Sequence, residues 1–148
     1  DILGDIEGLS FLELFAGSGA VGFEALSRGV SELVLVEYNR DCQIAIRNNI
    51  EMLKDNSCRL YPRQAEAAVA AFHKEGRLFN IIFCDPPYRL GLAKKTLQTL
   101  SDYDILAPDG FVVIQHEEKE MLPDNLGVFS LIKSSFYGNT ALSFYRKI

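Results

Sequence analysis

The sequence predicts an α/β fold in which a mostly parallel, doubly wound sheet of seven strands ends in an antiparallel hairpin. Short apolar runs alternate with helical patterns five times, which is typical of a parallel sheet covered by helices on both faces. The fourth run, Phe79–Cys84, is apolar, as expected for a strand that is buried on both sides. Two extended stretches close the chain, and Gly138-Asn139 between them indicates a hairpin.

The expected elements follow one another in a regular order. The parallel strands are Ser10–Phe15, Glu32–Glu37, Cys58–Tyr61, Phe79–Cys84 and Gly110–Gln115. The first helix ends near Arg28, and the second runs from an Asn39 cap to about Leu53. The third helix covers Gln64–His73, and the fourth covers about Leu92–Leu100. The hairpin strands are Leu126–Tyr137 and Thr140–Arg146. Because no repeat, low-complexity tract or linker interrupts this order, we expect residues 1–148 to form a single domain.

Composition argues against several classes of protein. The chain is 48% hydrophobic, but no apolar run approaches the roughly 20 residues that a membrane helix requires. Its three cysteines and two histidines lack the spacing of a disulfide framework or a zinc site. We therefore expect a cytoplasmic protein that contacts no membrane and binds no metal. We also expect a monomer, although the composition does not determine the oligomeric state. The net charge of −5 also argues against a broad basic surface for nucleic acid.

A glycine-rich turn follows the first strand. Gly17, Gly19 and Gly22 fit the pattern G-x-G-x-x-G, which lets the chain turn sharply and a ligand approach the backbone closely. Glu37 ends the second strand 20 positions after Gly17, and its carboxylate can accept hydrogen bonds from both hydroxyls of a ribose. These features indicate a ligand that contains adenosine, and NAD and S-adenosylmethionine both fit.

Glu13 lies in the apolar strand that precedes this turn. A buried carboxylate requires a partner. We consider two partners: the backbone amides of the turn, or the amino acid portion of the ligand.

The loop Asp85-Pro86-Pro87-Tyr88 follows the fourth strand and is the most informative stretch of the sequence. An amino group on an aromatic base is a poor nucleophile, because its lone pair is delocalised into the ring. Asp85 can accept a hydrogen bond from such an amine and stabilise the positive charge that develops on its nitrogen, and the Pro86 carbonyl can accept a second bond. The prolines fix the direction of the chain, and Tyr88 offers a face on which a base can stack. The loop therefore favours amine methylation over hydride transfer, for which no His or Tyr-Lys arrangement is evident.

Two stretches, Leu12–Gly29 and Phe79–Tyr88, closely resemble the bacterial 16S rRNA guanine-N2 methyltransferases of the RsmD type. The segment Tyr137–Thr140 resembles the last hairpin of that family. The resemblance implies a Rossmann-like class I methyltransferase fold. It also implies methylation of one guanine amine in the RNA of the small ribosomal subunit, with S-adenosylmethionine as donor and S-adenosylhomocysteine as product.

The resemblance also assigns roles to individual residues. By this match Gly17, Ser18 and Gly19 cradle the cofactor, Glu37 holds its ribose, and Asp85–Tyr88 hold the guanine. The remaining expected cofactor contacts are Glu13, Phe15, Gln64, Ala65 and Asp85. Gln64-Ala65 stands where the family usually has Asp-Ala, and the Gln64 side-chain oxygen can still accept a hydrogen bond from the adenine amino group.

The family's basic N-terminal segment does not precede the first strand here, which puts RNA binding by this chain in doubt. Several other functions also remain open: an adenine-N6 methyltransferase acting on DNA or RNA, a protein-amide methyltransferase, an NAD-binding oxidoreductase and an inactive methyltransferase-like binding module. Arg89, Lys94 and Lys95 either meet RNA phosphates or form a solvated helix face. His116 is a minor candidate for substrate contact. Four phenylalanines are expected in the core: Phe111, Phe129, Phe136 and Phe144.

Overall fold

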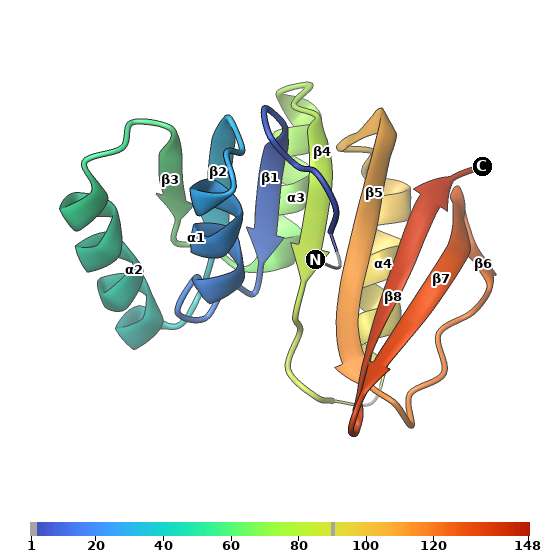
Figure 1. Ribbon diagram of the computed structural model, residues 1–148. Coiled ribbons are helices and arrows are strands. Elements are labelled where there is room, and N and C mark those ends of the chain that lie inside the picture. Colours follow the sequence, from blue (N-terminus) through green and yellow to red (C-terminus); the bar gives the residue numbers. More distant parts are fainter. Residues whose placement is uncertain (1–2, 90) are drawn as a thin grey trace.

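A computed structural model describes residues 3–89 and 91–148 of the chain. Within them, one sheet of eight strands forms the centre of the molecule, in the order β3-β2-β1-β4-β5-β8-β7-β6 (Figure 1). The first five of these strands are parallel and the last three are antiparallel. Their bounds are β1 Ser10–Leu14, β2 Glu32–Val36, β3 Cys58–Tyr61, β4 Phe79–Cys84, β5 Leu106–Glu117, β6 Asn125–Leu126, β7 Phe129–Tyr137 and β8 Thr140–Lys147.

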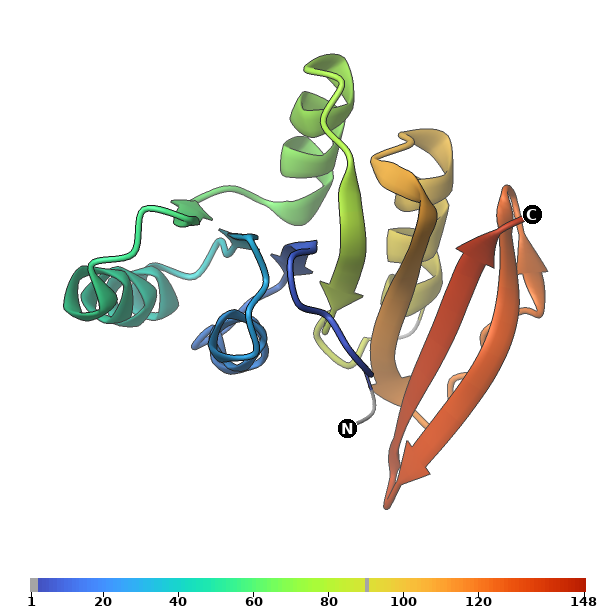
Figure 2. The same cartoon turned by 45° about the horizontal axis from the view of Figure 1, so that its top comes forward.

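Helices cover both faces of the parallel part of the sheet. Helices α1 (Ala20–Ser27) and α2 (Arg40–Leu53) lie on one face, and α3 (Ala65–Lys74) and α4 (Leu92–Asp102) lie on the other (Figures 1 and 2). The predicted doubly wound α/β architecture with a C-terminal antiparallel hairpin is therefore confirmed.

The local sequence explains these elements. In β1, Leu12 and Leu14 pack under α3 and α4, whereas Phe11 packs on the side of α1 and α2, as the two-residue period of a strand requires. The predicted cap of α2 is also confirmed, because Asn39 Oδ1 accepts a hydrogen bond from the backbone N–H of Cys42 at 3.0 Å.

The order of the strands reverses at β1. The chain passes from β1 outward through β2 to β3, then returns to β4 on the other side of β1. Leu14 pairs with Val36 in β2 and with Cys84 in β4. The residues that directly follow β1, β2 and β4 therefore lie at the same level along the sheet. Sheets of this kind bind their ligands at the point where the strand order reverses.

The C-terminal part of the sheet differs from the prediction in two respects. Within the described residues the sheet has eight strands instead of seven, because Gly127 adopts a φ of +56° and divides the expected stretch Leu126–Tyr137 into β6 and β7. The prediction that Phe136 belongs to the core was wrong, since 61% of it is exposed. Phe136 pairs with Ala141 near the end of the hairpin, which lies beyond the helices that cover the parallel strands (Figure 1).

Gly22→Ala is expected to destabilise the fold. A Cβ at this buried position of α1 would lie 2.8 Å from Glu13 Oε1, Leu33 Cδ1 and Leu35 Cδ2. Overpacking of this kind costs roughly 1–3 kcal/mol, which urea denaturation would measure. Ser18→Ala is the control, because Ser18 is exposed in the glycine-rich turn that precedes α1. This variant should leave the free energy of unfolding nearly unchanged. Equal stability of Gly22→Ala and the wild type would contradict the packing described here.

Candidate active site

Three carboxylates gather at the carboxyl ends of β1, β2 and β4. Glu13 lies in β1, and Glu37 and Asp85 directly follow β2 and β4. Because Leu14 pairs with the last residue of both neighbouring strands, Glu37 and Asp85 lie on either side of Phe15. The predicted cofactor and acceptor carboxylates are thus brought to one place.

Backbone N–H groups hold two of these carboxylates. Glu37 Oε1 accepts a hydrogen bond from Gly17 at 2.6 Å, and its Oε2 accepts one from Asn39 at 2.8 Å. Glu13 is buried, and its Oε1 accepts a hydrogen bond from Gly22 at 2.9 Å. Of the two partners considered for Glu13, the structure therefore shows the turn amide.

The electrostatics of this site favour a cation. Burial raises the pKa of Glu13 to about 8 against the opposing effect of the Gly22 N–H, and the charges of Asp85 and Glu37 raise this pKa further. Burial also raises the pKa of Asp85. Since a positive charge placed among these groups would favour their ionised forms, the site is suited to a sulfonium or an ammonium group.

The glycine-rich turn has the backbone conformation that its sequence predicts. Gly17 has a φ of +59° and Gly19 one of +82°, and both lie in the left-handed region that glycine enters without strain. Phe15 also lies in this region, with a φ of +56°. A bulky residue rarely adopts this conformation, and strained residues cluster at functional sites, so the conformation of Phe15 supports a binding role for the turn.

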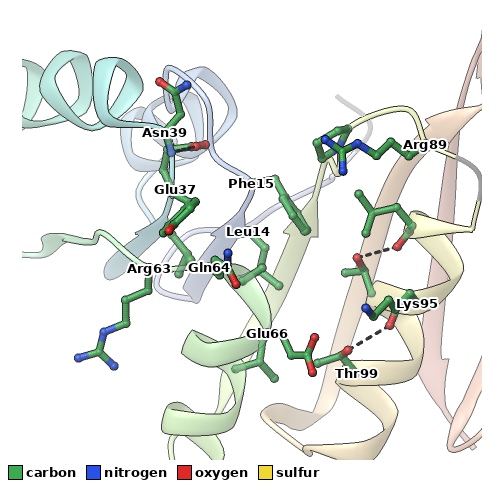
Figure 3. Close-up of a pocket in the computed structure, with 17 residues that line it drawn as sticks. Leu14, Phe15, Glu37, Asn39, Arg63, Gln64, Glu66, Arg89, Lys95 and Thr99 are labelled. Carbon is green, nitrogen blue, oxygen red and sulfur yellow. Dashed lines mark hydrogen bonds between the residues drawn. The ribbon is translucent and has the colours of Figure 1, made fainter.

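A cleft of about 540 Å³ opens between the ends of β1 and β2 and the first turns of α3 and α4 (Figure 3). Its volume is in the range of small-molecule sites. Glu37 and Phe15 lie at one side of the cleft and Gln64 at the start of α3. Three cations, Arg63, Arg89 and Lys95, also line it, and none of them makes an ion pair within residues 3–89 and 91–148.

The predicted site residues divide between this cleft and its surroundings. Those that line the cleft are Phe15, Glu37, Gln64, Ala65 and Pro87. Those that lie outside its lining are Glu13, Gly17, Ser18, Gly19, Asp85, Pro86 and Tyr88. Gln64 occupies the cap position of α3, but its side chain makes no capping hydrogen bond, so it is available to a ligand.

Tyr88 extends from the loop Asp85–Tyr88, called the acceptor loop below, toward the hairpin. Its hydroxyl lies 3.2 Å from Thr140 Oγ1 at the start of β8, and 49% of the residue is exposed. Pro86 is buried and Pro87 is exposed, so the loop is anchored at its beginning and open at its end. The stacking of a base on Tyr88 stays a prediction.

Sequence reasoning missed several residues that line the cleft, among them Tyr38 and Arg63, and it considered one residue, His116, that lies outside it. Tyr38 lines the cleft and is 65% exposed, and its position directly after Glu37 could have identified it. His116, which was considered for substrate contact, is buried instead. Its Nε2 lies 2.8 Å from Ser143 Oγ and its Nδ1 lies 2.9 Å from the Glu117 carbonyl, so both ring nitrogens have partners within the sheet.

Residues 1–146 match the family described as Conserved hypothetical protein 95. The chain belongs to this family. It is 34% identical over 137 residues to YlbH of Bacillus subtilis (strain 168), covering 92% of this chain and 74% of that protein. It is 33% identical over 136 residues to the ribosomal RNA small subunit methyltransferase D of Escherichia coli (strain K12), covering 92% of this chain and 67% of that protein.

The fold comparison agrees with this assignment. The structure of the yhhF protein from Escherichia coli superposes with a TM-score of 0.86 at 32% identity, covering 99% of this chain and 79% of that one. The resemblance drawn from the glycine-rich turn and the acceptor loop is confirmed, and the fold is that of class I methyltransferases. Within the part of the chain that the structure describes, no helix is long and apolar enough to cross a membrane.

Glu13→Gln is expected to flatten the dependence of stability on pH. The folded protein keeps the Glu13 proton up to a pKa of about 8, whereas an unperturbed glutamate releases it near 4.5. Because the folded state binds more protons over this window, the free energy of unfolding falls as pH rises from about 4.5 to about 8 and is level above it. One pKa unit corresponds to about 1.4 kcal/mol, so a pKa that rises from 4.5 to about 8 corresponds to a total loss of roughly 5 kcal/mol.

Urea denaturation across this pH range would measure the effect. The raised pKa of Asp85 contributes a decline of the same sign that begins at lower pH and persists in the variant. Glu51→Gln, at an exposed position of α2, is the matched control and should keep the decline seen in the wild type. An unchanged decline in Glu13→Gln would show that Glu13 is ionised in the folded protein.

Proposed function

We propose that this protein transfers a methyl group from S-adenosylmethionine to the exocyclic N2 amine of a guanine in the RNA of the small ribosomal subunit. One observation carries the proposal: a carboxylate suited to ribose, Glu37, and an amine-acceptor loop, Asp85–Tyr88, flank the same residue at the reversal of strand order. The ribosomal substrate is supported by the name of the Escherichia coli relative and by the resemblance of the two motifs.

The cleft and the turn together would hold the cofactor. Each oxygen of Glu37 uses one lone pair on a backbone N–H, so each has another for a ribose hydroxyl. Gln64 and Tyr38 lie beyond Glu37 and would meet the adenine, while the glycine turn would meet the methionine portion. S-adenosylmethionine supplies the methyl group on a positively charged sulfonium, which fits the surplus of carboxylates at this site.

The acceptor loop would bind and activate the amine. Asp85 accepts one N–H of the base and the Pro86 carbonyl accepts the other, which holds the nitrogen lone pair in line with the methyl group. As the nitrogen–carbon bond forms and the carbon–sulfur bond breaks, the nitrogen becomes positive, and the Asp85 carboxylate stabilises this charge. The raised pKa of Asp85 makes it a better acceptor for the proton that the amine then releases.

Asp85→Ala is expected to abolish methyl transfer. Removing one group that stabilises charge in a transition state lowers kcat by roughly 100-fold or more. The full chain would be incubated with radiolabelled S-adenosylmethionine and small ribosomal subunits from cells that lack the enzyme, and the labelled nucleosides would be separated by chromatography. Asp109→Ala is the control and should retain activity, because Asp109 is exposed and lies near the start of β5, at the end of the strand away from the acceptor loop.

The identity of the labelled nucleoside decides the substrate. Label in N2-methylguanosine that disappears in Asp85→Ala supports the proposal. Label in N6-methyladenosine would keep the chemistry but assign a different base. Binding of the cofactor without label in any RNA would overturn the proposal in favour of a protein substrate or a binding module.

Glu37→Gln is expected to weaken cofactor binding. The amide keeps the size of the side chain but removes its charge and one acceptor, and a hydrogen bond to a charged group is worth about 1.5–3 kcal/mol. The dissociation constant for S-adenosylmethionine, measured by calorimetry, should therefore rise roughly tenfold or more. Glu66→Gln removes a carboxylate from the α3 side of the same cleft and is the matched control. Equal losses in both variants would indicate a general effect of charge instead of a ribose contact.

A further inference from the structure

The tip of the β7–β8 hairpin projects beyond the carboxyl ends of the parallel strands. It lies at the same end of the molecule as the acceptor loop (Figures 1 and 2). The tip, defined here as Phe136–Thr140, closes with Gly138 at a φ of +60°, which suits a two-residue hairpin loop. The backbone N–H of Glu118 donates to the Asn139 carbonyl at 2.8 Å, so the tip is fixed to the end of β5.

Large aromatic side chains are exposed at this end of the molecule. Phe136 is 61% exposed, Tyr137 is 58% exposed and Tyr88 is 49% exposed. Exposed aromatic rings that gather beside a functional loop mark a binding surface, because each leaves a large apolar area in contact with water. The proposed catalytic steps do not use Phe136 or Tyr137.

The strand register places Tyr137 beside the acceptor loop. Tyr137 pairs directly with Thr140, and the side chains of such a pair share one face of the sheet. The Thr140 hydroxyl lies 3.2 Å from that of Tyr88. Tyr137 and Tyr88 therefore both adjoin Thr140, whereas Phe136 lies on the opposite face of the hairpin.

We propose that Tyr137 stacks on an unpaired RNA nucleotide that neighbours the target guanine, so that the hairpin tip forms one wall of the RNA site. This inference rests on the proposed function. A base that leaves its stack to reach the acceptor loop exposes the face of its neighbour, and an aromatic ring can cover that face. Thr140 positions this wall by joining the tip to Tyr88.

The charges at the tip favour a base over a phosphate as the ligand. The five residues Phe136–Thr140 carry no charge, and two carboxylates are nearby: Glu117 at the adjacent end of β5, and Glu118, which directly follows this strand. Carboxylates repel phosphate oxygens, but they oppose the stacking of a neutral base far less. Phosphates would instead meet Arg89 and Lys95, which have no ion pairs within residues 3–89 and 91–148.

Tyr137→Ala tests the proposal in the methyl-transfer assay with unmodified small subunits. We expect the KM for the particle to rise roughly tenfold, as for the loss of one stacking contact, with little change in kcat and none in cofactor affinity. Tyr137→Phe keeps the ring and should stay within about twofold of the wild type. The loss should also be independent of salt concentration, because stacking releases no counterions, whereas Arg89→Ala should reduce the dependence of KM on salt.

Phe136→Ala is the matched control, since it removes an equally exposed ring from the opposite face of the same tip. It should leave KM within about twofold of the wild type. An unchanged KM in Tyr137→Ala, or equal losses in the two alanine variants, would overturn the assignment of Tyr137 while methyl transfer by the wild type still stands. No methyl transfer to RNA by the wild type would overturn the proposed function and this inference together.

Discussion

The pairing of β1 with β2 on one side and β4 on the other determines where the functional residues of this chain lie. Leu14 is fully buried and pairs with the last residue of β2 and the last residue of β4, so the residues that follow the three strands lie at one level. The glycine turn, Glu37 and the acceptor loop start from these three strand ends. A slip of one residue in either pairing would turn every side chain of the slipped strand to the other face of the sheet and separate Glu37 from Asp85. The apolar core is thus also what positions the polar site.

Concentrating carboxylates in this way opposes stability. Glu13 is buried next to two other acidic groups, and a single Gly22 N–H does not offset the loss of hydration, so its pKa rises to about 8. A hydrophobic residue in its place would suit the surrounding strand better. The strained backbone of Phe15 at the same turn is a second local cost. Such costs persist where a ligand compensates for them, and a cationic cofactor would do so here.

Much of this structure could be predicted from the sequence because local patterns encode it. The alternation of strands and helices, the Asn39 cap and the glycine turn each depend on a few neighbouring residues. The contact between Tyr88 and Thr140 spans 52 positions and depends on how the hairpin docks on β5, which no local pattern reports. For the same reason the sequence did not show where the side chain of His116 lies, since its partner Ser143 is on the adjacent strand β8. The short strand β6 was missed because Gly127-Val128 carries a weaker turn signal than Gly138-Asn139.

An acidic chain can still recognise RNA if it does so locally. The net charge of this sequence is −5, so these residues would gain little from attraction along a long phosphate backbone. Arg63, Arg89 and Lys95 line the cleft beside the loop that would receive the base, and none of them makes an ion pair with the residues that the structure describes. Tyr88, at the end of this loop, and Tyr137, at the hairpin tip, both adjoin Thr140. In this arrangement a few cations would position the RNA backbone, and two aromatic rings would stack on bases. Such a site would select an unpaired nucleotide over a continuous duplex. That selection matches the needs of a reaction whose target amine must leave its base stack before it can be methylated.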